Sequence, residues 1–141
     1  MATEVAPDRA TETTPLDDER PWTPGSVWAV DFIRVKEGHE IEYGRRLADT
    51  WKKVLEEQMK QGVVLSYKIL SGMPSSREDF THLLMIEFPN YAALDQRAKL
   101  DSSVKKVFGS LQSAQEMFRK RQEVCEAIGS RLLREMHFKE R

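Results

Sequence analysis

The chain has 141 residues, of which 40% are hydrophobic and 32% are charged, and its formal net charge is −1. This length fits one domain with a packed core, and the near-neutral charge gives no general electrostatic attraction to nucleic acid or to an anionic membrane. The single cysteine, Cys125, excludes an internal disulfide, and because the chain lacks a long apolar run or an apolar leader, we expect a soluble cytoplasmic protein.

Residues 1–25 are predicted to form a flexible acidic arm, and the folded domain is predicted to span residues 26–141. The arm contains four of the six prolines, and its six acidic residues outnumber two basic ones. This composition is typical of disordered segments. Trp22 is unusual there: it either docks on the domain or on a partner subunit, or it is a partly exposed residue just before the first strand.

The segments that follow alternate between strand-like and helical patterns. Runs rich in β-branched and aromatic residues predict strands, whereas apolar residues at three- and four-residue spacing predict helices. In chain order, the first half is predicted to contain a strand at 27–35, a helix at 39–61 that ends at Gly62, a strand at 63–70, a loop at 71–79 and a strand at 80–88.

The second half is predicted to be mostly helical. Asn90 is suited to cap a short helix, and the sequence DSS at 101–103 resembles a second cap, which predicts a break in the helix there. A long helix follows, with Cys125 on its apolar face, and Gly129 ends it. Residues 131–139 are predicted to form the last strand.

The predicted order, β-α-β-β-α-β, is that of the split βαβ or ferredoxin-like arrangement. Right-handed crossovers then give a four-stranded antiparallel sheet with both helices on one face. In this topology the first and third strands are central. The sequence therefore predicts the α+β class with a ferredoxin-like fold.

Each predicted strand has two faces, because side chains alternate along it. The more apolar sets are predicted to face the helices: Trp28, Val30, Phe32 and Arg34; Leu65, Tyr67 and Ile69; His82, Leu84, Ile86 and Phe88; Leu132, Arg134, Met136 and Phe138. The opposite face still contains Ile33, Val35, Val64, Leu70, Leu83, Met85 and Leu133. That is too much apolar surface to leave in water, so we expect a homodimer that pairs two sheets.

Four segments of the sequence resemble the dimeric α+β barrel superfamily, which includes the antibiotic-biosynthesis monooxygenase-like proteins. They read GSVWAVDFIRVKEG, ADTWKKVLEEQMKQG, VVLSYKILSG and LLMIEFPNYAALD, and they lie between residues 25 and 96. Within the superfamily, the chain is most similar to small bacterial proteins of unassigned function. The resemblance implies a homodimeric barrel with a small cavity. Members include cofactor-free oxygenases, isomerases, polyketide cyclases and haem-binding enzymes, and fold alone does not choose among them.

Asp31 is the sharpest candidate for chemistry, because a carboxylate in the middle of a central strand is costly unless it is paired. Strand alternation predicts that it shares the uncovered face with Glu87, Lys68 and His137. These four could be a structural ion-pair network that fixes the dimer register. Alternatively, a desolvated Asp31 or Glu87 could act as a general base in proton abstraction.

Other residues are weaker candidates for ligand binding. Tyr67, Trp28 and Trp51 either line an aromatic pocket or belong to the core, and His82 is predicted at the rim of the sheet. His39 is predicted to be exposed at a helix start. The histidines lack metal-binding spacing, and the chain has no nucleotide-binding or serine-hydrolase motif, so we expect neither a metal site nor a cofactor.

Two classes of function remain open from the sequence. One is a cofactor-independent enzyme or ligand binder that acts on a small apolar molecule by oxygenation, isomerisation or cyclisation. The other is a non-catalytic dimeric interaction module. A cavity of roughly 300 Å³ or more lined by Asp31 or Glu87 would favour the first.

Overall fold

The computed structural model describes residues 19–140, apart from the side chains of residues 97–101. Strands and helices alternate in the predicted order. The elements are β1 (Trp22–Val35), α3 (Glu40–Arg46), the π-helical segment η2 (Leu47–Trp51), α4 (Lys52–Lys60), β2 (Ser66–Ser71), β3 (His82–Phe88), the 3-10 helix η3 (Tyr91–Asp95), α5 (Arg97–Phe108), α6 (Leu111–Arg121) and β4 (Cys125–Phe138).

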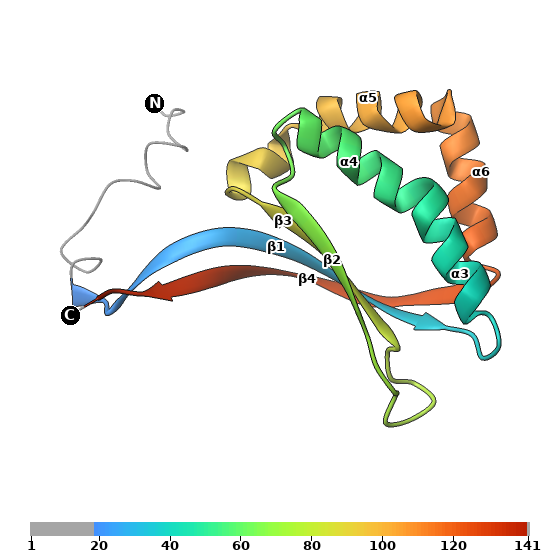
Figure 1. Cartoon of the computed structure of the whole chain (residues 1–141), viewed down its shortest axis with the longest axis horizontal. Coiled ribbons are helices and arrows are strands. Elements are labelled where there is room, and N and C mark those ends of the chain that lie inside the picture. Colours follow the sequence, from blue (N-terminus) through green and yellow to red (C-terminus); the bar gives the residue numbers. More distant parts are fainter. Residues whose placement is uncertain (1–18, 141) are drawn as a thin grey trace.

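The four strands form one antiparallel sheet in the order β2-β3-β1-β4. The helices cover one face of this sheet, and the other face is bare (Figure 1). β1 and β3 are central, as predicted, so the ferredoxin-like α+β fold is confirmed. β1 and β4 continue past the helical layer as a long two-stranded ribbon (Figure 1).

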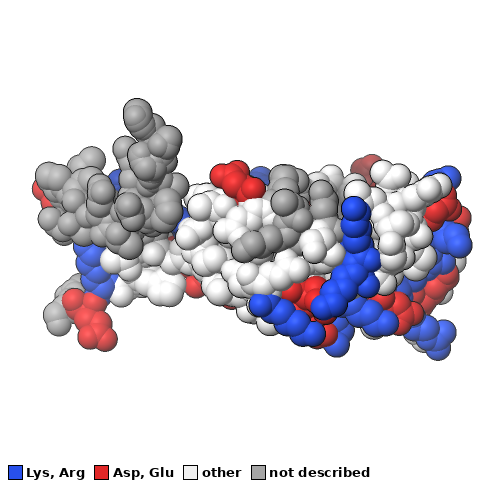
Figure 2. Space-filling view, turned by 90° about the horizontal axis from the view of Figure 1, so that it is seen from above, with Lys and Arg blue, Asp and Glu red and all other residues white. Residues whose placement is uncertain are grey.

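The solvent side of the helical layer carries both signs of charge. Lys and Arg side chains lie beside Asp and Glu side chains there (Figure 2). They form ion pairs such as Arg46–Glu42 and Lys52–Glu56, which join successive helical turns, and Lys106–Glu57, which joins α5 to α4. The mixture is typical of a solvated helix face, not of a surface for a polyanion.

The core between sheet and helices consists of two clusters that share one side chain. One cluster contains Val27, Leu55, Val63, Val64, Phe88 and Ala93, and the other contains Ile33, Val35, Tyr43, Leu47, Leu84 and Val124. Trp51 packs against both clusters. The indole therefore stands where the two halves of the core meet.

Trp51 owes its position to a π-helical turn within the first helical stretch. The Thr50 hydroxyl donates a hydrogen bond to the Arg46 carbonyl at 2.6 Å, and the Lys52 amide donates to the Leu47 carbonyl, five residues back. Such π turns insert an extra residue into a helix and are frequent at functional sites. The turn rotates Trp51 relative to an unbroken α-helix.

The second half of the chain differs from the prediction in two places. α5 runs unbroken through residues 101–103, and the break falls at Gly109, whose φ of +88° suits glycine, and at Ser110, which caps α6. The second helical stretch ends at Arg121, and Cys125 opens β4 instead of lying on a helix. The prediction of a helix to residue 128 was wrong, because pairing of Cys125 with Val35 and of Ala127 with Ile33 on β1 places this segment in the sheet.

The sheet also begins earlier in the chain than the predicted start of the domain at residue 26. β1 begins at Trp22, which lies opposite Phe138 on β4, so residues 22–25 belong to the sheet. Residues 1–18, most of the predicted arm, lie outside the described part of the chain.

The predicted faces of β1 are reversed. Asp31 lies opposite Leu84 and Ile33 opposite His82, and directly opposed residues share a face of the sheet. Asp31 and Ile33 therefore point toward the helices, whereas Trp28 points to the bare face. The faces of β2 and β3 are as predicted. Both faces of β1 are strongly apolar, so alternation alone could not choose between them.

Candidate functional site

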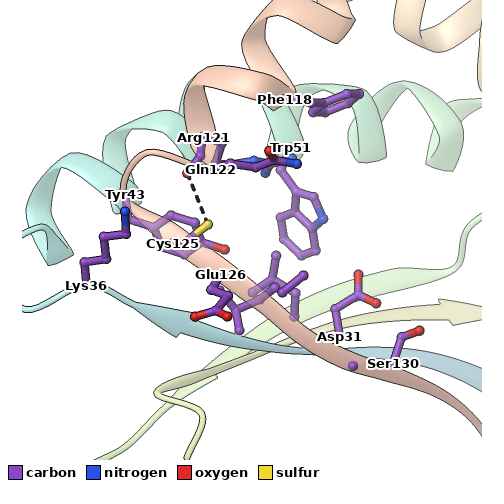
Figure 3. Close-up of a pocket in the computed structure, with 14 residues that line it drawn as sticks. Asp31, Lys36, Tyr43, Trp51, Phe118, Arg121, Gln122, Cys125, Glu126 and Ser130 are labelled. Atoms are coloured by element: carbon purple, nitrogen blue, oxygen red, sulfur yellow. Dashed lines mark hydrogen bonds between the residues drawn. The ribbon is translucent and has the colours of Figure 1, made fainter. Parts of the chain in front are cut away.

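A cavity of about 800 Å³ lies between the sheet and the helical layer. Its floor comes from β1, β3 and β4, its sides from α3 and η2, and its roof from α6 (Figure 3). The volume falls within the range of sites for small molecules. Eight of its fourteen lining residues carry polar groups: Asp31, Lys36, Tyr43, Arg121, Gln122, Cys125, Glu126 and Ser130. The other six are apolar: Ile33, Trp51, Leu84, Phe118, Ala127 and Gly129.

Asp31 projects from β1 into this cavity (Figure 3). It is half-buried, and its carboxylate has no hydrogen bond or ion pair with the described residues. Burial raises the pKa of Asp31 above its ordinary value, and the positive charge of Arg121 offsets part of this rise. Asp31 is therefore a carboxylate with increased proton affinity that can contact a molecule bound in the cavity.

Tyr43 of α3 closes one side of the cavity. The residue is only 1% exposed, and its hydroxyl has no hydrogen-bond partner within the described part of the chain. Its ring packs edge-on against His82 at a centroid distance of 5.6 Å. Burial is the largest cause that raises the pKa of the Tyr43 hydroxyl, and the electrostatic interaction with Cys125 raises it further. The group therefore stays protonated and can act as a hydrogen-bond donor.

Arg121 and Cys125 lie at the junction of α6 and β4. The Arg121 guanidinium stands over the Phe118 ring, 5.2 Å from its centroid. The Cys125 thiol donates a hydrogen bond to the Arg121 carbonyl at 3.3 Å, and burial raises the pKa of this thiol. The thiol is thus held in its neutral form, whereas Arg121 supplies positive charge to the cavity.

A second cavity of about 310 Å³ lies beside the first, with α3, η2 and the start of α4 on one side and β2 and the start of β3 on the other. Tyr43 and Trp51 line both cavities and so form the wall between them. Trp51 is fixed by an edge-on contact with Tyr67 at 5.3 Å, and the Tyr67 hydroxyl donates to Glu56 at 3.0 Å. Tyr67 and the half-buried His82 line this second cavity, and His82 is the first residue of β3, at its hairpin end.

Glu87, Lys68 and His137 lie on the bare face of the sheet, and the prediction that Asp31 joins them was wrong. The Ser26 hydroxyl lies 2.6 Å from Glu87 and 2.8 Å from Glu135, which links these two carboxylates. Three further contacts complete the network: Ser66 donates to Glu87, Trp28 donates to Glu135, and His137 lies 3.1 Å from Glu135. Lys68 stands over the Trp28 ring at 4.9 Å.

The two carboxylates predicted as candidate bases thus differ in environment. Glu87 is engaged by two serine hydroxyls, at 2.6 Å each, whereas Asp31 is unpaired in a cavity. Of the two, Asp31 is therefore the carboxylate that is free to interact with a molecule bound in the cavity.

The sequence analysis did not identify Tyr43, Arg121 or Cys125 as parts of a site. Tyr43 precedes Leu47 and Trp51 by four and eight residues, which is a helical face. That spacing could have placed Tyr43 on the buried face of the helix. The predicted apolar face included Ile41 instead, and Ile41 is 73% exposed. Arg121 and Cys125 join the cavity only because α6 ends at Arg121, and the sequence pattern did not show that end.

In the described part of the chain, no helix is both long and apolar enough to cross a membrane. No cluster of three or more His, Cys, Asp or Glu side chains among the described residues has the geometry to hold a metal ion.

Comparisons with known proteins support the fold. No protein-family model and no curated protein matches the chain. The chain is similar to a dimeric ferredoxin-like protein from an uncultured marine organism, with a TM-score of 0.52 and 13% identity, covering 82% of this chain and 90% of that one. This likeness supports the ferredoxin-like fold and shows nothing of the activity.

Two other solved structures match with lower TM-scores. One is a conserved protein of unknown function from Bacteroides thetaiotaomicron, described as a possible oxidoreductase, with a TM-score of 0.44 and 15% identity, covering 79% of this chain and 97% of that one. The other is a conserved protein from Methanosarcina mazei, with a TM-score of 0.45 and 18% identity, covering 82% and 94%.

Proposed function

We propose that the protein binds a small, mostly apolar molecule in the cavity between sheet and helices, and that Asp31 accepts a proton from it. The observation that carries this proposal is an 800 Å³ cavity into which an unpaired, half-buried carboxylate projects. A carboxylate that served only structure would have a cation or hydrogen-bond donors at contact distance. The raised pKa of Asp31, caused by burial, favours proton uptake.

The proton transfer needs no cofactor when the substrate has an acidic C–H bond next to a carbonyl. The Asp31 carboxylate takes the proton, the C–H bond breaks, and its electron pair moves onto the carbonyl oxygen as an enolate. In a substrate with a double bond beyond that carbon, the enolate is conjugated, and return of the proton from Asp31 to the far end of the double bond gives an isomer. Attack of the enolate on a second carbonyl of the same molecule closes a ring, and the proton on Asp31 passes to the new alkoxide. If dioxygen is the co-reactant, a methylene group becomes a carbonyl and water leaves, which balances as a monooxygenation.

We infer that the working unit is a homodimer. The bare face of the sheet exposes large apolar side chains, including Leu70 at 50% and Leu133 at 46%, and a second copy can cover them with the same surface. The similar marine protein is a dimer. A cytoplasmic location stays a prediction from the sequence.

The test is hydrogen exchange at carbon in a simple ketone. 2-Indanone is incubated with the protein in D2O, and loss of its α-proton signal is followed by NMR. We expect the wild-type protein to accelerate exchange and the Asp31→Asn variant to lose about 100-fold or more of that rate. Asp49→Asn is the matched control, because Asp49 is an exposed residue of η2 that lies outside both cavities.

Equal exchange rates for the wild-type protein and Asp31→Asn would refute the proton-transfer role. Binding of 2-indanone without any acceleration would also refute it and would favour a binding or interaction module.

A further inference from the structure

We propose that the Tyr43 hydroxyl, together with Arg121, binds a ligand oxygen that carries or develops negative charge. This deepens the proposed function and rests on it. It names the ligand class: a molecule with a carbonyl or phenolic oxygen on an apolar frame, oriented so that this oxygen faces α3 and α6.

The first observation is that the Tyr43 hydroxyl has no hydrogen-bond partner among the described residues. The side chain is packed in the core, with the residue 1% exposed, and its oxygen is not one of the fully enclosed unpaired polar atoms, so it borders the cavity. Phenylalanine would fill the same space in the core, so packing alone does not require the hydroxyl. By contrast, the hydroxyl of Tyr67, on the other side of Trp51, has Glu56 as its acceptor at 3.0 Å. An acceptor for Tyr43 is therefore absent from the described residues, and a bound molecule can provide it.

The second observation is the direction of the hydroxyl. In Figure 3 the Tyr43 side chain comes from α3 and its oxygen points toward the interior of the cavity, beside Cys125. The charged or ionisable groups that act on this hydroxyl are Cys125, Arg121 and Asp31. All three line the same 800 Å³ cavity.

The third observation is the division of charge around the cavity. Asp31 brings negative charge from the sheet, whereas Arg121 brings positive charge from α6, and no residue among those described forms an ion pair with Arg121. When a base removes a proton next to a carbonyl, negative charge develops on the oxygen. A neutral O–H donor and a cation placed at that oxygen stabilise the charge.

The experiment uses two probes of similar shape: 4-nitrophenol, which has an ionisable oxygen, and nitrobenzene, which lacks it. The full chain with Asp31→Asn is the background, because the amide resembles the protonated carboxyl that follows proton transfer. Affinities are measured by calorimetry, and the absorption band of 4-nitrophenolate reports the pKa of the bound probe.

We expect Tyr43→Phe, added to this background, to weaken 4-nitrophenolate binding about 10- to 100-fold and to raise the pKa of the bound probe. Nitrobenzene binding should change less than about threefold. Tyr91→Phe is the control, because Tyr91 is 47% exposed and lies outside the cavities. Arg121→Gln should have the same selective effect and keeps the test valid if Tyr43→Phe does not fold.

The outcomes separate this inference from the proposed function. If nitrobenzene binds but Tyr43→Phe leaves both affinities unchanged, or weakens both equally, this inference is wrong and the cavity still binds small molecules. If neither probe binds to the background protein, the proposed function fails with it.

Discussion

Replacement of Asp31 by asparagine should stabilise the folded protein at pH 7. The carboxylate is half-buried, it has no hydrogen bond or ion pair with the described residues, and burial raises its pKa. Asparagine has nearly the same shape and carries no charge, so it removes the cost of an ionised group in the cavity. Because the residue is only partly buried and water in the open cavity screens the charge, we expect a gain of less than about 1 kcal/mol.

The pH dependence provides a second check on the same variant. A raised pKa means that the folded state binds the Asp31 proton more tightly than the unfolded state does. The stabilisation from the protonated carboxyl is therefore present at low pH and is lost as the pH rises through the raised pKa. The advantage of Asp31→Asn over the wild-type protein should grow from pH 4 to pH 7, while the Asp49→Asn control shows no such trend.

The assay is urea unfolding of the three proteins at several pH values, with thermal unfolding as a check. A gain of 1 kcal/mol corresponds to about 3–5 °C in Tm for a domain of this size. Breaking a buried ion pair by removing one partner costs about 3–5 kcal/mol. If Asp31→Asn loses stability on that scale, Asp31 is part of a structural ion pair and our interpretation of the cavity is wrong.

Three further predictions concern the fold and its assembly. Leu133→Glu should raise the dissociation constant of the dimer at least about tenfold in sedimentation, because it places a charge on the bare face. Ile41→Glu, at an exposed helical residue, should leave the dimer intact. A wild-type monomer at micromolar concentration would contradict the dimer. Gly109→Ala should cost about 1–2 kcal/mol because φ is +88°, whereas Gly44→Ala within α3 should raise stability by up to about 1 kcal/mol; denaturant unfolding that ranks them in the opposite order would refute this. Deletion of residues 1–18 should shift Tm by less than about 3 °C, because their composition is poor in apolar residues, and a larger fall would show that they pack on the domain.

The element order and the sheet topology could be predicted because strand and helix periodicities differ strongly in this chain. The face of β1 could not, because Trp28 and Phe32 on one side are as apolar as Ile33 and Val35 on the other. Only pairing with β3 decides the matter, by placing Asp31 opposite Leu84. The end of α6 was misplaced because pairing of Cys125 with Val35 on β1, a contact distant in sequence, starts β4 there.

The candidate site was predicted in part. Asp31 was singled out because a carboxylate in a central strand is unusual, and that argument does not depend on the face to which it points. Its surroundings were predicted wrongly, since the reversed face replaced Glu87 and Lys68 with Tyr43 and Arg121. Tertiary packing places Tyr43 of α3 and Arg121 of α6 around one cavity over β1, and no local pattern in the sequence encodes that arrangement.

Native mass spectrometry tests the central claim most directly, with the wild-type protein compared with Ser130→Phe. Ser130 lies opposite Asp31 on β4, and its side chain points into the cavity (Figure 3), so a phenyl ring there should occupy the part of the cavity next to the Asp31 carboxylate. After incubation with 2-indanone, we expect the wild-type protein to carry one ketone per chain and Ser130→Phe to carry none, with an unchanged assembly and Tm. Equal loading of both proteins, or no loading of the wild-type protein, would contradict the assignment of this cavity as the binding site.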